Sequence, residues 1–377
     1  MNLIYLNNAA TSWPKAPLLG AKVATCLEEI PFHAGRSGFS GADFAGKCRA
    51  LLASLLSVKE PARIIFAPNA THALNILLHG FPLSAGSAVI TTEAEHNSVL
   101  RPLYYLAKKK NFAVHFVPVN RDGRVSLSDW EAAVRRYSPQ LAVFTHASNV
   151  TGAVNDAALL AKIAKKGGAG TLLDASQSLG LVPVHPTDMD LDMVVFTGHK
   201  YLLGPPGTGG LYLGPGIDLE PVWVGGTGIK SDLAEMPPEL PTRFEAGTPN
   251  DPAFAGLAAA LSWAADNAFD SAELTQKTER LAAGLSDAGA KVINVQAPRT
   301  PVISFTLDGW SVEDAGEILQ KSFGIVCRTG LHCAPRIHTF LNTAPAGTIR
   351  FSLSRFTTDA EIDYCLKAVK GLLYETI

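Results

Sequence analysis

Short apolar runs alternate with longer stretches of helical periodicity through the first two thirds of the chain. The apolar runs predict seven strands, at residues 63–66, 88–91, 113–118, 141–145, 170–174, 193–197 and 209–213. Between most of them the pattern predicts helices, at residues 71–78, 97–110, 128–137 and 155–166. Strands that alternate with helices are typical of an α/β sheet covered by helices on both faces. Because ligands of such sheets bind beyond the carboxyl ends of the strands, the residues just after each run are candidates for a binding site.

The rhythm of the pattern changes after residue 225. Residues 225–252 are rich in Gly, Pro and Thr and predict irregular structure, and an alanine-rich helix follows at 252–288 with a break near 267–270. Further strands are predicted at 302–306, 325–327 and 348–353, with helices at 312–323 and 359–374. We therefore expect an N-terminal segment (1–14), a large domain with a mostly parallel seven-stranded sheet (15–250) and a smaller α+β domain (251–377).

The composition agrees with two soluble domains. The chain has 377 residues, more than the roughly 250–300 at which single cores stop growing. Its 47% hydrophobic and 18% charged residues exclude a disordered, collagenous or coiled-coil protein. The formal charge of −2 provides no basic field for nucleic acid. No apolar run reaches the roughly 18 residues of a membrane span, so no membrane association is expected.

The cysteine pattern indicates reduced thiols. The five cysteines lie at positions 26, 48, 327, 333 and 365 and form no CxxC pair. The N-terminus lacks the basic region and apolar core of an export signal. A cytoplasmic protein is therefore expected. Cys26, Cys48 and Cys365 fall in helix-like segments and are expected to be packing residues, and Cys327 falls in a strand. Cys333 lies in a glycine-bearing loop directly after His332.

A lysine stands at the end of one buried strand. The segment Thr197-Gly198-His199-Lys200 ends this strand, and a glycine-rich turn begins at Gly204. A lysine beside an apolar wall has a lowered pKa, which frees its amine for Schiff-base chemistry. A surface lysine in a loop is the simpler alternative. A phosphate-binding P-loop is disfavoured because its lysine follows the glycines, whereas Lys200 precedes them.

Other strand ends also carry polar residues. Asp174 ends a strand with Gln177 shortly after it, and an Asp that keeps a pyridine nitrogen protonated is what makes pyridoxal phosphate an electron sink. A helix N-cap is the alternative role for Asp174. Asn69-Ala70-Thr71 opens a helix whose free N–H groups suit a phosphate. His96 could stack on an aromatic ring or act as a cap, and Asn149 lies at the same rim.

The ordered set of motifs resembles the class V aminotransferase family of fold type I pyridoxal-phosphate enzymes, and more narrowly the cysteine desulfurases and selenocysteine lyases. The matching motifs are Asn69-Ala70-Thr71-His72, Glu95-His96-Asn97-Ser98, Ser148-Asn149-Val150-Thr151-Gly152, Asp174-Ala175-Ser176-Gln177 and Thr197-Gly198-His199-Lys200. The resemblance extends from Tyr5 to Ser352 and so covers nearly the whole chain.

The resemblance implies a role for each motif residue toward pyridoxal 5′-phosphate. Lys200 would form the Schiff base, Asp174 would pair with the pyridinium nitrogen, Gln177 would contact the ring hydroxyl, and His96 would stack on the ring. The phosphate would be held by Ala70, Thr71, Thr197 and His199. In this family a threonine of the partner subunit often completes the phosphate site, which makes Thr248 the candidate and implies a homodimer.

The resemblance also implies a nucleophile and a carboxylate anchor in the C-terminal domain. Cys327-Arg328-Thr329-Gly330-Leu331-His332-Cys333-Ala334-Pro335 resembles the nucleophile segment of desulfurases with a short cysteine loop. His332 and Arg328 are expected to raise the thiolate fraction of Cys333, for which a buried packing role is the alternative. Arg350 matches the arginine that grips the substrate carboxylate, with Asn149 and Asn8 beside the substrate; a surface strand arginine is the alternative.

These residues predict a cysteine desulfurase that converts L-cysteine to L-alanine and places the sulfur on Cys333 as a persulfide, with a sulfur-acceptor protein as a further partner. A selenocysteine lyase and another class V reaction, such as transamination or β-elimination, remain alternatives. A silent sulfur-carrier or scaffolding subunit is disfavoured by the intact Lys200, Asp174 and His96. Leu331 replaces the first of two histidines found in many relatives, and Arg355-Phe356-Thr357 replaces a Tyr-Asn-Thr segment, which leaves the substrate and the acceptor open. No metal site is predicted.

Overall fold

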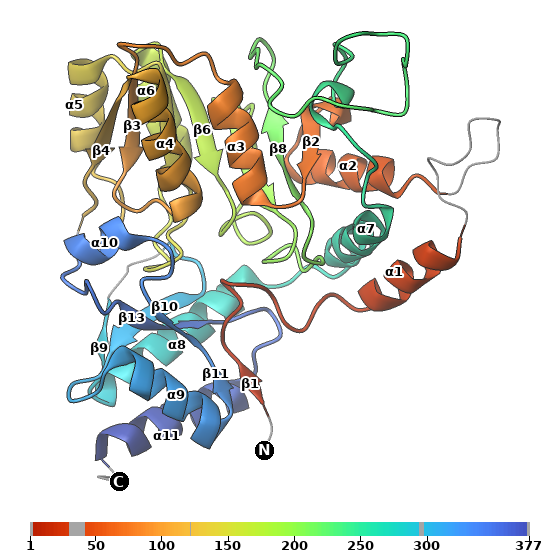
Figure 1. Ribbon diagram of the computed structural model, residues 1–377. Coiled ribbons are helices and arrows are strands. Elements are labelled where there is room, and N and C mark those ends of the chain that lie inside the picture. Colours follow the sequence, from red (N-terminus) through yellow and green to blue (C-terminus); the bar gives the residue numbers. More distant parts are fainter. Residues whose placement is uncertain (1–2, 30–41, 121, 294–297, 375–377) are drawn as a thin grey trace.

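A seven-stranded sheet forms the centre of the N-terminal two thirds of the computed structural model, which describes residues 3–29, 42–120, 122–293 and 298–374 (Figure 1). Its strands are β2 (Ile64–Ala67), β3 (Ala88–Thr92), β4 (Ala113–Val117), β5 (Leu141–Thr145), β6 (Gly170–Asp174), β7 (Met193–Thr197) and β8 (Gly209–Leu213). Their order in space is β2-β8-β7-β6-β5-β3-β4. Only β8 runs antiparallel to its neighbours, so the predicted mostly parallel sheet is confirmed.

Helices cover both faces of this sheet. One face packs against α3 (Ala70–Gly80) and α4 (Asn97–Lys110). The other packs against α2 (Phe44–Leu55), α5 (Leu127–Tyr137), α6 (Ala157–Lys166) and α7 (Asp251–Asp266), and α1 (Leu19–Glu28) lies on α7. The strands are apolar throughout because successive side chains point to opposite faces. Leu141 and Val143 of β5 join the core under α3, whereas Ala142 and Phe144 join the core under α5.

Capping side chains mark where many of the helices begin. The side chains of Asn69, Ser126, Asp156 and Asn250 each accept a hydrogen bond from a backbone N–H three residues later. Such caps satisfy one of the N–H groups that a helix leaves without a partner at its start. The chain therefore changes from strand to helix within a few residues, which keeps the ends of the strands close to the first turns of the helices.

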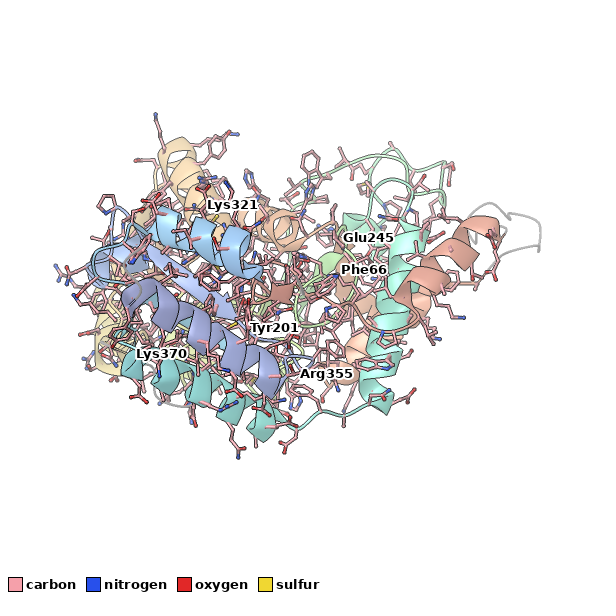
Figure 2. All side chains as sticks on the ribbon, turned by 90° about the horizontal axis from the view of Figure 1, so that it is seen from below. Phe66, Tyr201, Glu245, Lys321, Arg355 and Lys370 are labelled. Carbon is pink, nitrogen blue, oxygen red and sulfur yellow. The ribbon has the colours of Figure 1, made fainter. Side chains whose placement is uncertain are left out.

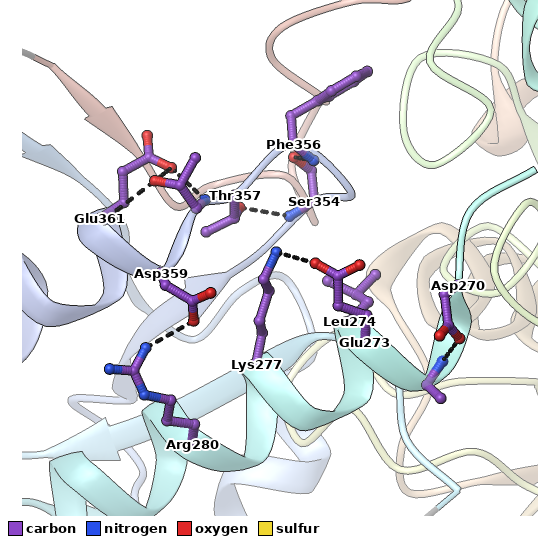
Figure 3. Close-up of polar contacts among 12 residues, drawn as sticks. Asp270, Glu273, Leu274, Lys277, Arg280, Ser354, Phe356, Thr357, Asp359 and Glu361 are labelled. Atoms are coloured by element: carbon purple, nitrogen blue, oxygen red, sulfur yellow. Dashed lines mark hydrogen bonds and ion pairs between the residues drawn. The ribbon is translucent and has the colours of Figure 1, made fainter. Parts of the chain in front are cut away.

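The C-terminal part is a smaller α+β unit. Its antiparallel sheet has the order β12 (Arg328–Gly330), β13 (Thr348–Ser352), β10 (Val302–Thr306) and β9 (Lys291–Val292). The helices α8 (Ser271–Asp287), α9 (Val312–Phe323) and α11 (Asp359–Tyr374) pack on this sheet. Arg280 of α8 donates to Asp359 of α11 at 2.8 Å, as Figure 3 shows. The short helix α10 (Pro335–Phe340) lies apart from them, at the junction with the large sheet (Figure 1).

Two features decide how the N-terminal two thirds and the C-terminal unit are connected. The first strand, β1 (Ile4–Tyr5), pairs in parallel with β11 (Ile325–Val326), so the start of the chain packs on its C-terminal unit. Phe254 and Leu257 of α7 belong to the core of the large sheet, whereas Leu274 and Leu281 of α8 belong to the C-terminal core. Helix α7 thus packs on the core of the large sheet and α8 on the C-terminal core. The domain boundary at 250/251 stays a prediction. Among the described residues, no helix has the length and hydrophobicity needed to cross a bilayer.

Candidate active site

A cavity of about 210 Å³ lies at the carboxyl ends of the central strands. Strand β3 has β4 on one side and β5 on the other, so the chain changes direction across the sheet here and leaves a crevice, as in other open α/β sheets. Arg328 and Arg350 of the C-terminal unit close the cavity from the opposite side. The predicted site residues that line it are Ala70, Thr71, His96, Asn149, Asp174, Gln177, Thr197, His199, Lys200 and Arg350.

The first turn of α3 provides an anion site at one end of the cavity. The Asn69 side chain accepts the N–H of His72 at 3.0 Å, and the Asn69 carbonyl accepts the N–H of Ala73 at 3.1 Å. The N–H groups of Ala70 and Thr71 precede the first intrahelical bonds and have no carbonyl partner within the helix. Because the positive end of the helix dipole lies at the same place, this end of the cavity favours a phosphate.

Lys200 and Asp174 come from the ends of the neighbouring strands β7 and β6. Burial lowers the pKa of Lys200 to about 8, and the nearby Asp174 carboxylate partly opposes that shift. Asp174 is 4% exposed, and its Oδ1 accepts the N–H of Ser176 at 2.9 Å. Asp174 thus caps a turn rather than a helix while it also faces the cavity. The lysine amine can lose its proton near neutral pH, which is the state that attacks a carbonyl.

His96 is both a helix cap and a cavity wall. Its Nδ1 accepts the N–H of Ser98 at 3.1 Å, and the Ser98 hydroxyl lies 2.8 Å from the same nitrogen. Burial, followed by the charge of Lys200, lowers the pKa of His96 to about 4. The imidazole is therefore neutral at physiological pH. Because Nδ1 accepts from a backbone N–H, the proton of the neutral ring is on Nε2.

Arg350 is a buried cation without a carboxylate partner among the described residues. It is 0% exposed on β13, which excludes a surface strand arginine. Its Nη1 donates to the carbonyl of Asn149 at 3.0 Å, its Nη2 donates to Oδ1 of Asn7 at 3.2 Å, and no described group accepts from its Nε. Burial lowers its pKa to about 10, so it remains charged. A buried guanidinium that lines a cavity in this way favours an anionic ligand.

Cys333 lies in a tight turn next to the cavity. The N–H of Ala334 donates to the carbonyl of Leu331 at 2.9 Å, and the two central residues, His332 and Cys333, have φ angles of 50° and 59°. Two consecutive left-handed residues define a type I′ turn, which favours Asn-Gly and costs roughly 1–3 kcal/mol for each residue of another type. Strain of this kind is characteristic of functional sites. Nη2 of Arg328 lies 3.2 Å from Sγ of Cys333.

The contribution of His332 differs from the sequence-based expectation. Burial lowers the pKa of His332 to about 2, so the imidazole is neutral and cannot raise the thiolate fraction of Cys333 by charge. Its Nε2 forms a hydrogen bond with Oγ1 of Thr348 at 2.9 Å. The expectation for His332 was wrong because the sequence places it in a loop but does not show that the loop is buried. Arg328, which lines the cavity, is the cation that contacts the thiol.

Three predicted site residues are not among those that line the cavity: Cys333, which lies beside it, Asn8 and Thr248. Asn8 is buried behind the cavity, where its Nδ2 donates to the carbonyl of Ser352 at 2.9 Å and its Oδ1 accepts the N–H of Trp13 at 3.1 Å. Its neighbours Ala9 and Ala10 form the wall instead, because both polar atoms of the Asn8 side chain are used by the backbone. Thr248 is exposed on the surface of this single chain.

The structure adds residues to which the sequence pattern assigned no role. Ser98 and Ser176 line the cavity. Glu95 is 0% exposed beneath it, and burial raises its pKa to about 8. Its Oε1 accepts from Oγ1 of Thr92 at 2.5 Å and from the N–H of Thr145 at 2.9 Å, so it joins the ends of β3 and β5. Its place in the Glu95-His96 motif was the only sequence signal, because a carboxylate is not expected in a core.

The comparison with family models identifies the chain. The model described as aminotransferase class-V matches residues 4–365. The chain belongs to the class V aminotransferase family. Within curated members of the family, it is 31% identical to the probable cysteine desulfurase 2 of Mycobacterium leprae over 391 aligned positions, which cover 98% of this chain and 91% of that protein. It is 29% identical to the probable cysteine desulfurase of Methanothermobacter thermautotrophicus, over 95% of this chain and 92% of that protein.

Solved structures of this family have the same fold. The apo structure of a cysteine desulfurase from Thermococcus onnurineus NA1 superposes with a TM-score of 0.90 at 26% identity, and covers 98% of this chain and 94% of that one. The cysteine desulfurase CsdA of Escherichia coli, in an S-sulfonic acid form, superposes with a TM-score of 0.87 at 25% identity, over 98% of this chain and 95% of that one. The predicted fold type I architecture is therefore confirmed.

Proposed function

We propose that this chain is a pyridoxal-phosphate-dependent cysteine desulfurase that converts L-cysteine into L-alanine and retains the sulfur on Cys333 as a persulfide. The observation that carries the proposal is the strained turn that holds Cys333 against Arg328 beside the cavity of Lys200. Arg328, which contacts the Cys333 sulfur, also lines the cavity of Lys200, so the nucleophile and the amine lie at one site. The names of the relatives and of the similar structures support this proposal.

The described residues fit pyridoxal 5′-phosphate, the cofactor of the family. The first turn of α3 would hold its phosphate together with Thr197 and His199, and Asp174 would pair with the ring nitrogen. Gln177 donates through Nε2 to the carbonyl of Ala9 at 2.9 Å, while its buried Oε1 has no described partner and would accept from the ring hydroxyl. When bound, this cofactor stabilises the electron pair left at the substrate α-carbon.

Arg350 would bind the substrate α-carboxylate. Its charge is fully buried and its described partners are the Asn149 carbonyl and Oδ1 of Asn7, so a bidentate contact with a substrate anion would neutralise it. Asn149 supports this arrangement through its backbone. Its carbonyl accepts from Arg350, whereas its side-chain Nδ2 donates to the carbonyl of His332 at 2.7 Å and so connects to the cysteine turn.

Lys200 and Cys333 would carry the proton and sulfur transfers. With a pKa of about 8, the Lys200 amine can accept the α-proton of the substrate and return it. The Cys333 thiolate attacks the substrate sulfur, so that an S–S bond forms and the substrate Cβ–S bond breaks. The electron pair of the broken bond stays with Cβ, which takes up a proton to give the methyl group of alanine. Cys333 is left as a persulfide, which a thiol of an acceptor protein would remove.

We also propose that two copies of this chain form the working enzyme in the cytoplasm. Thr248 is exposed and does not line the cavity of its own chain, so it is available to complete the phosphate site of a second copy. Trp223 and Val224 expose 53% and 73% of their surface in the segment that leads to Thr248, and Trp223 stacks on His72 of α3. All five cysteines are free, as expected in a reducing compartment. Analytical ultracentrifugation of the cofactor-loaded protein tests the dimer. A sedimentation mass equal to that of one chain would contradict it.

Mass spectrometry after incubation with L-cysteine tests the proposed reaction. We expect one added sulfur on Cys333, and Cys333→Ala should abolish it and slow alanine release by about 100-fold, equivalent to ~2.7 kcal/mol. Cys327→Ala is the matched control, because Cys327 is also half-buried near β12 and should leave the adduct on Cys333 intact. Alanine release from L-cysteine at the wild-type rate in Cys333→Ala would show that the persulfide mechanism is wrong. Wild-type activity of that variant on L-selenocysteine alone would favour the lyase.

A further inference from the structure

Arg336, which lies three residues after Cys333, joins the C-terminal unit to the large sheet. Its Nε and Nη2 donate to the two carboxylate oxygens of Glu93 at 2.6 and 2.7 Å, which is a bidentate ion pair. Its Nη1 donates to the Tyr104 hydroxyl at 3.0 Å, and its guanidinium lies 3.7 Å from the centre of the Phe116 ring. The Glu93 carboxylate holds the pKa of Arg336 above its usual value despite burial. These partners come from β4, from α4 and from the residue after β3.

The same surface of the large sheet also holds the cysteine turn directly. The carbonyl of Cys333 accepts the N–H of Asn97, the first residue of α4, at 2.7 Å. Beyond the turn, Ala334 and Ile337 are 0% exposed and pack against residues of the large sheet, chiefly Ala94, Val119 and Val150. Helix α4 thus contacts the segment 333–336 at two points, the carbonyl of Cys333 and the guanidinium of Arg336.

The strained turn needs such support. A type I′ turn built from His332 and Cys333 lacks the Asn-Gly sequence that stabilises this conformation, so local preference alone does not hold it. Of the contacts that follow the turn, the Arg336–Glu93 pair is bidentate, charge-assisted and partly shielded from water, with side chains 33% and 20% exposed. α10 has only six residues, too few for a helix to be stable by itself.

We propose that Arg336 is a positioning residue whose bidentate pair with Glu93 holds the Cys333 turn against the cavity, so that the thiol is in reach of the substrate sulfur. The inference rests on the proposed desulfurase function. Because α10 begins immediately after the turn, release of its anchor frees Cys333 to leave Arg328, whereas the groups that line the cavity from the large sheet keep their places.

Arg336→Met tests this inference in the cofactor-loaded enzyme, because it keeps the length of the side chain and removes the charge. We expect amide hydrogen exchange in the peptide 331–341 to become at least about 10-fold faster. We also expect the kcat for alanine formation to fall roughly 10- to 100-fold while the KM for L-cysteine and the absorbance of the cofactor stay near wild-type values. The exchanged pair Glu93→Arg with Arg336→Glu should restore part of the lost rate and of the exchange protection.

Arg49→Met is the matched control. Arg49 also forms a bidentate pair, with Glu245 at 2.9 Å to each oxygen, and it stacks over Phe66 at 4.4 Å; Figure 2 labels Glu245 and Phe66. This variant should lose stability without faster exchange in 331–341.

Wild-type exchange of 331–341 in Arg336→Met would overturn the inference, whatever the activity. If Arg336→Met does not fold, Arg336→Lys, which keeps the charge but not the bidentate geometry, is measured in the same way. Absence of a persulfide on wild-type Cys333 would overturn the proposed function instead, because the amide exchange of 331–341 still reports on the Arg336–Glu93 pair.

Discussion

Lys200 is held in a place that disfavours its own charge. Burial is the largest influence on this amine and lowers its pKa from 10.5 to about 8. Burial of the charged ammonium lowers the free energy of unfolding. The same burial makes the neutral amine, which is the reactive form, available near neutral pH. Asp174 reduces the cost only in part.

The cost should be visible in the cofactor-free protein. Between pH 8 and 10.5 the unfolded chain binds a proton at Lys200 that the folded chain does not, so the free energy of unfolding should rise with pH through this window. Lys200→Met removes this dependence. We expect the variant to exceed the wild type in stability most at pH 7.5 and least at pH 10.5, in urea denaturation at both pH values. Lys370, exposed at the surface (Figure 2), gives the control variant Lys370→Met. An equal difference at the two pH values would contradict the burial of Lys200.

Single residues of the site were predictable where a strand end fixes their place. Lys200, Asp174 and His96 follow apolar runs whose carboxyl ends meet in one crevice, so the pattern was enough to bring them together. Asn8 and His332 were harder to place. Whether their side chains face the cavity or the backbone behind it depends on turns formed with distant segments, and these contacts leave no periodic signal in the sequence.

Elements were predictable where an apolar run or a helical period is clear in the sequence. The strands at 141–145, 170–174 and 193–197 and the helices at 97–110 and 312–323 agree with the structure to the residue. The two- and three-residue strands β1, β9 and β12 show no alternation, and α10 is too short for helical periodicity. These short elements depend on neighbours from elsewhere in the chain, and it is they that carry the N-terminus, Arg328 and the cysteine turn.

Gly152 shows how closely two elements approach each other. It has a φ of 79°, and a Cβ at this position would lie 2.8 Å from the carbonyl oxygen of Val302 and 2.9 Å from that of Thr300. We therefore expect Gly152→Ala to lower the free energy of unfolding by roughly 2–5 kcal/mol, through backbone strain and overpacking, as measured in urea. Gly168→Ala is the control, because its φ of 83° is equally unfavourable but nothing lies within 4 Å. Equal losses in the two variants would show that the contact with β10 is unimportant.

At the scale of the whole molecule, buried histidines predict sensitivity to acid. His146, His332 and His338 are at most 2% exposed, and each forms a hydrogen bond with a hydroxyl group. Burial lowers their pKa values to about 4, 2 and 4. Below pH 6.5 the histidines of the unfolded chain bind protons, whereas these three histidines of the folded chain do not. The free energy of unfolding should therefore fall as the pH decreases toward 4.

Each of these histidines lowers the free energy of unfolding by at most about 1.4 kcal/mol per pH unit in that range. We expect the urea midpoint to fall steeply between pH 6.5 and pH 5, and His146→Gln should make the fall less steep. Circular dichroism at fixed urea concentrations is sufficient for the measurement. If the wild-type midpoint is the same at both pH values, the three imidazoles are not held neutral by the fold.

The pairing of Ile4 and Tyr5 with Ile325 and Val326 has a consequence for the order in which the protein is made. Ribosomes release the chain from its N-terminus, so β1 must wait for a partner that is synthesised near the end, while the large sheet can close as soon as β8 has emerged. Arg350 lies on β13 and is translated later still. A nascent or truncated chain can thus assemble the face of the cavity that comes from the large sheet but lacks the buried guanidinium that we propose for the substrate carboxylate. Under the proposed function, catalytic competence is acquired only after β13 has been translated and folded.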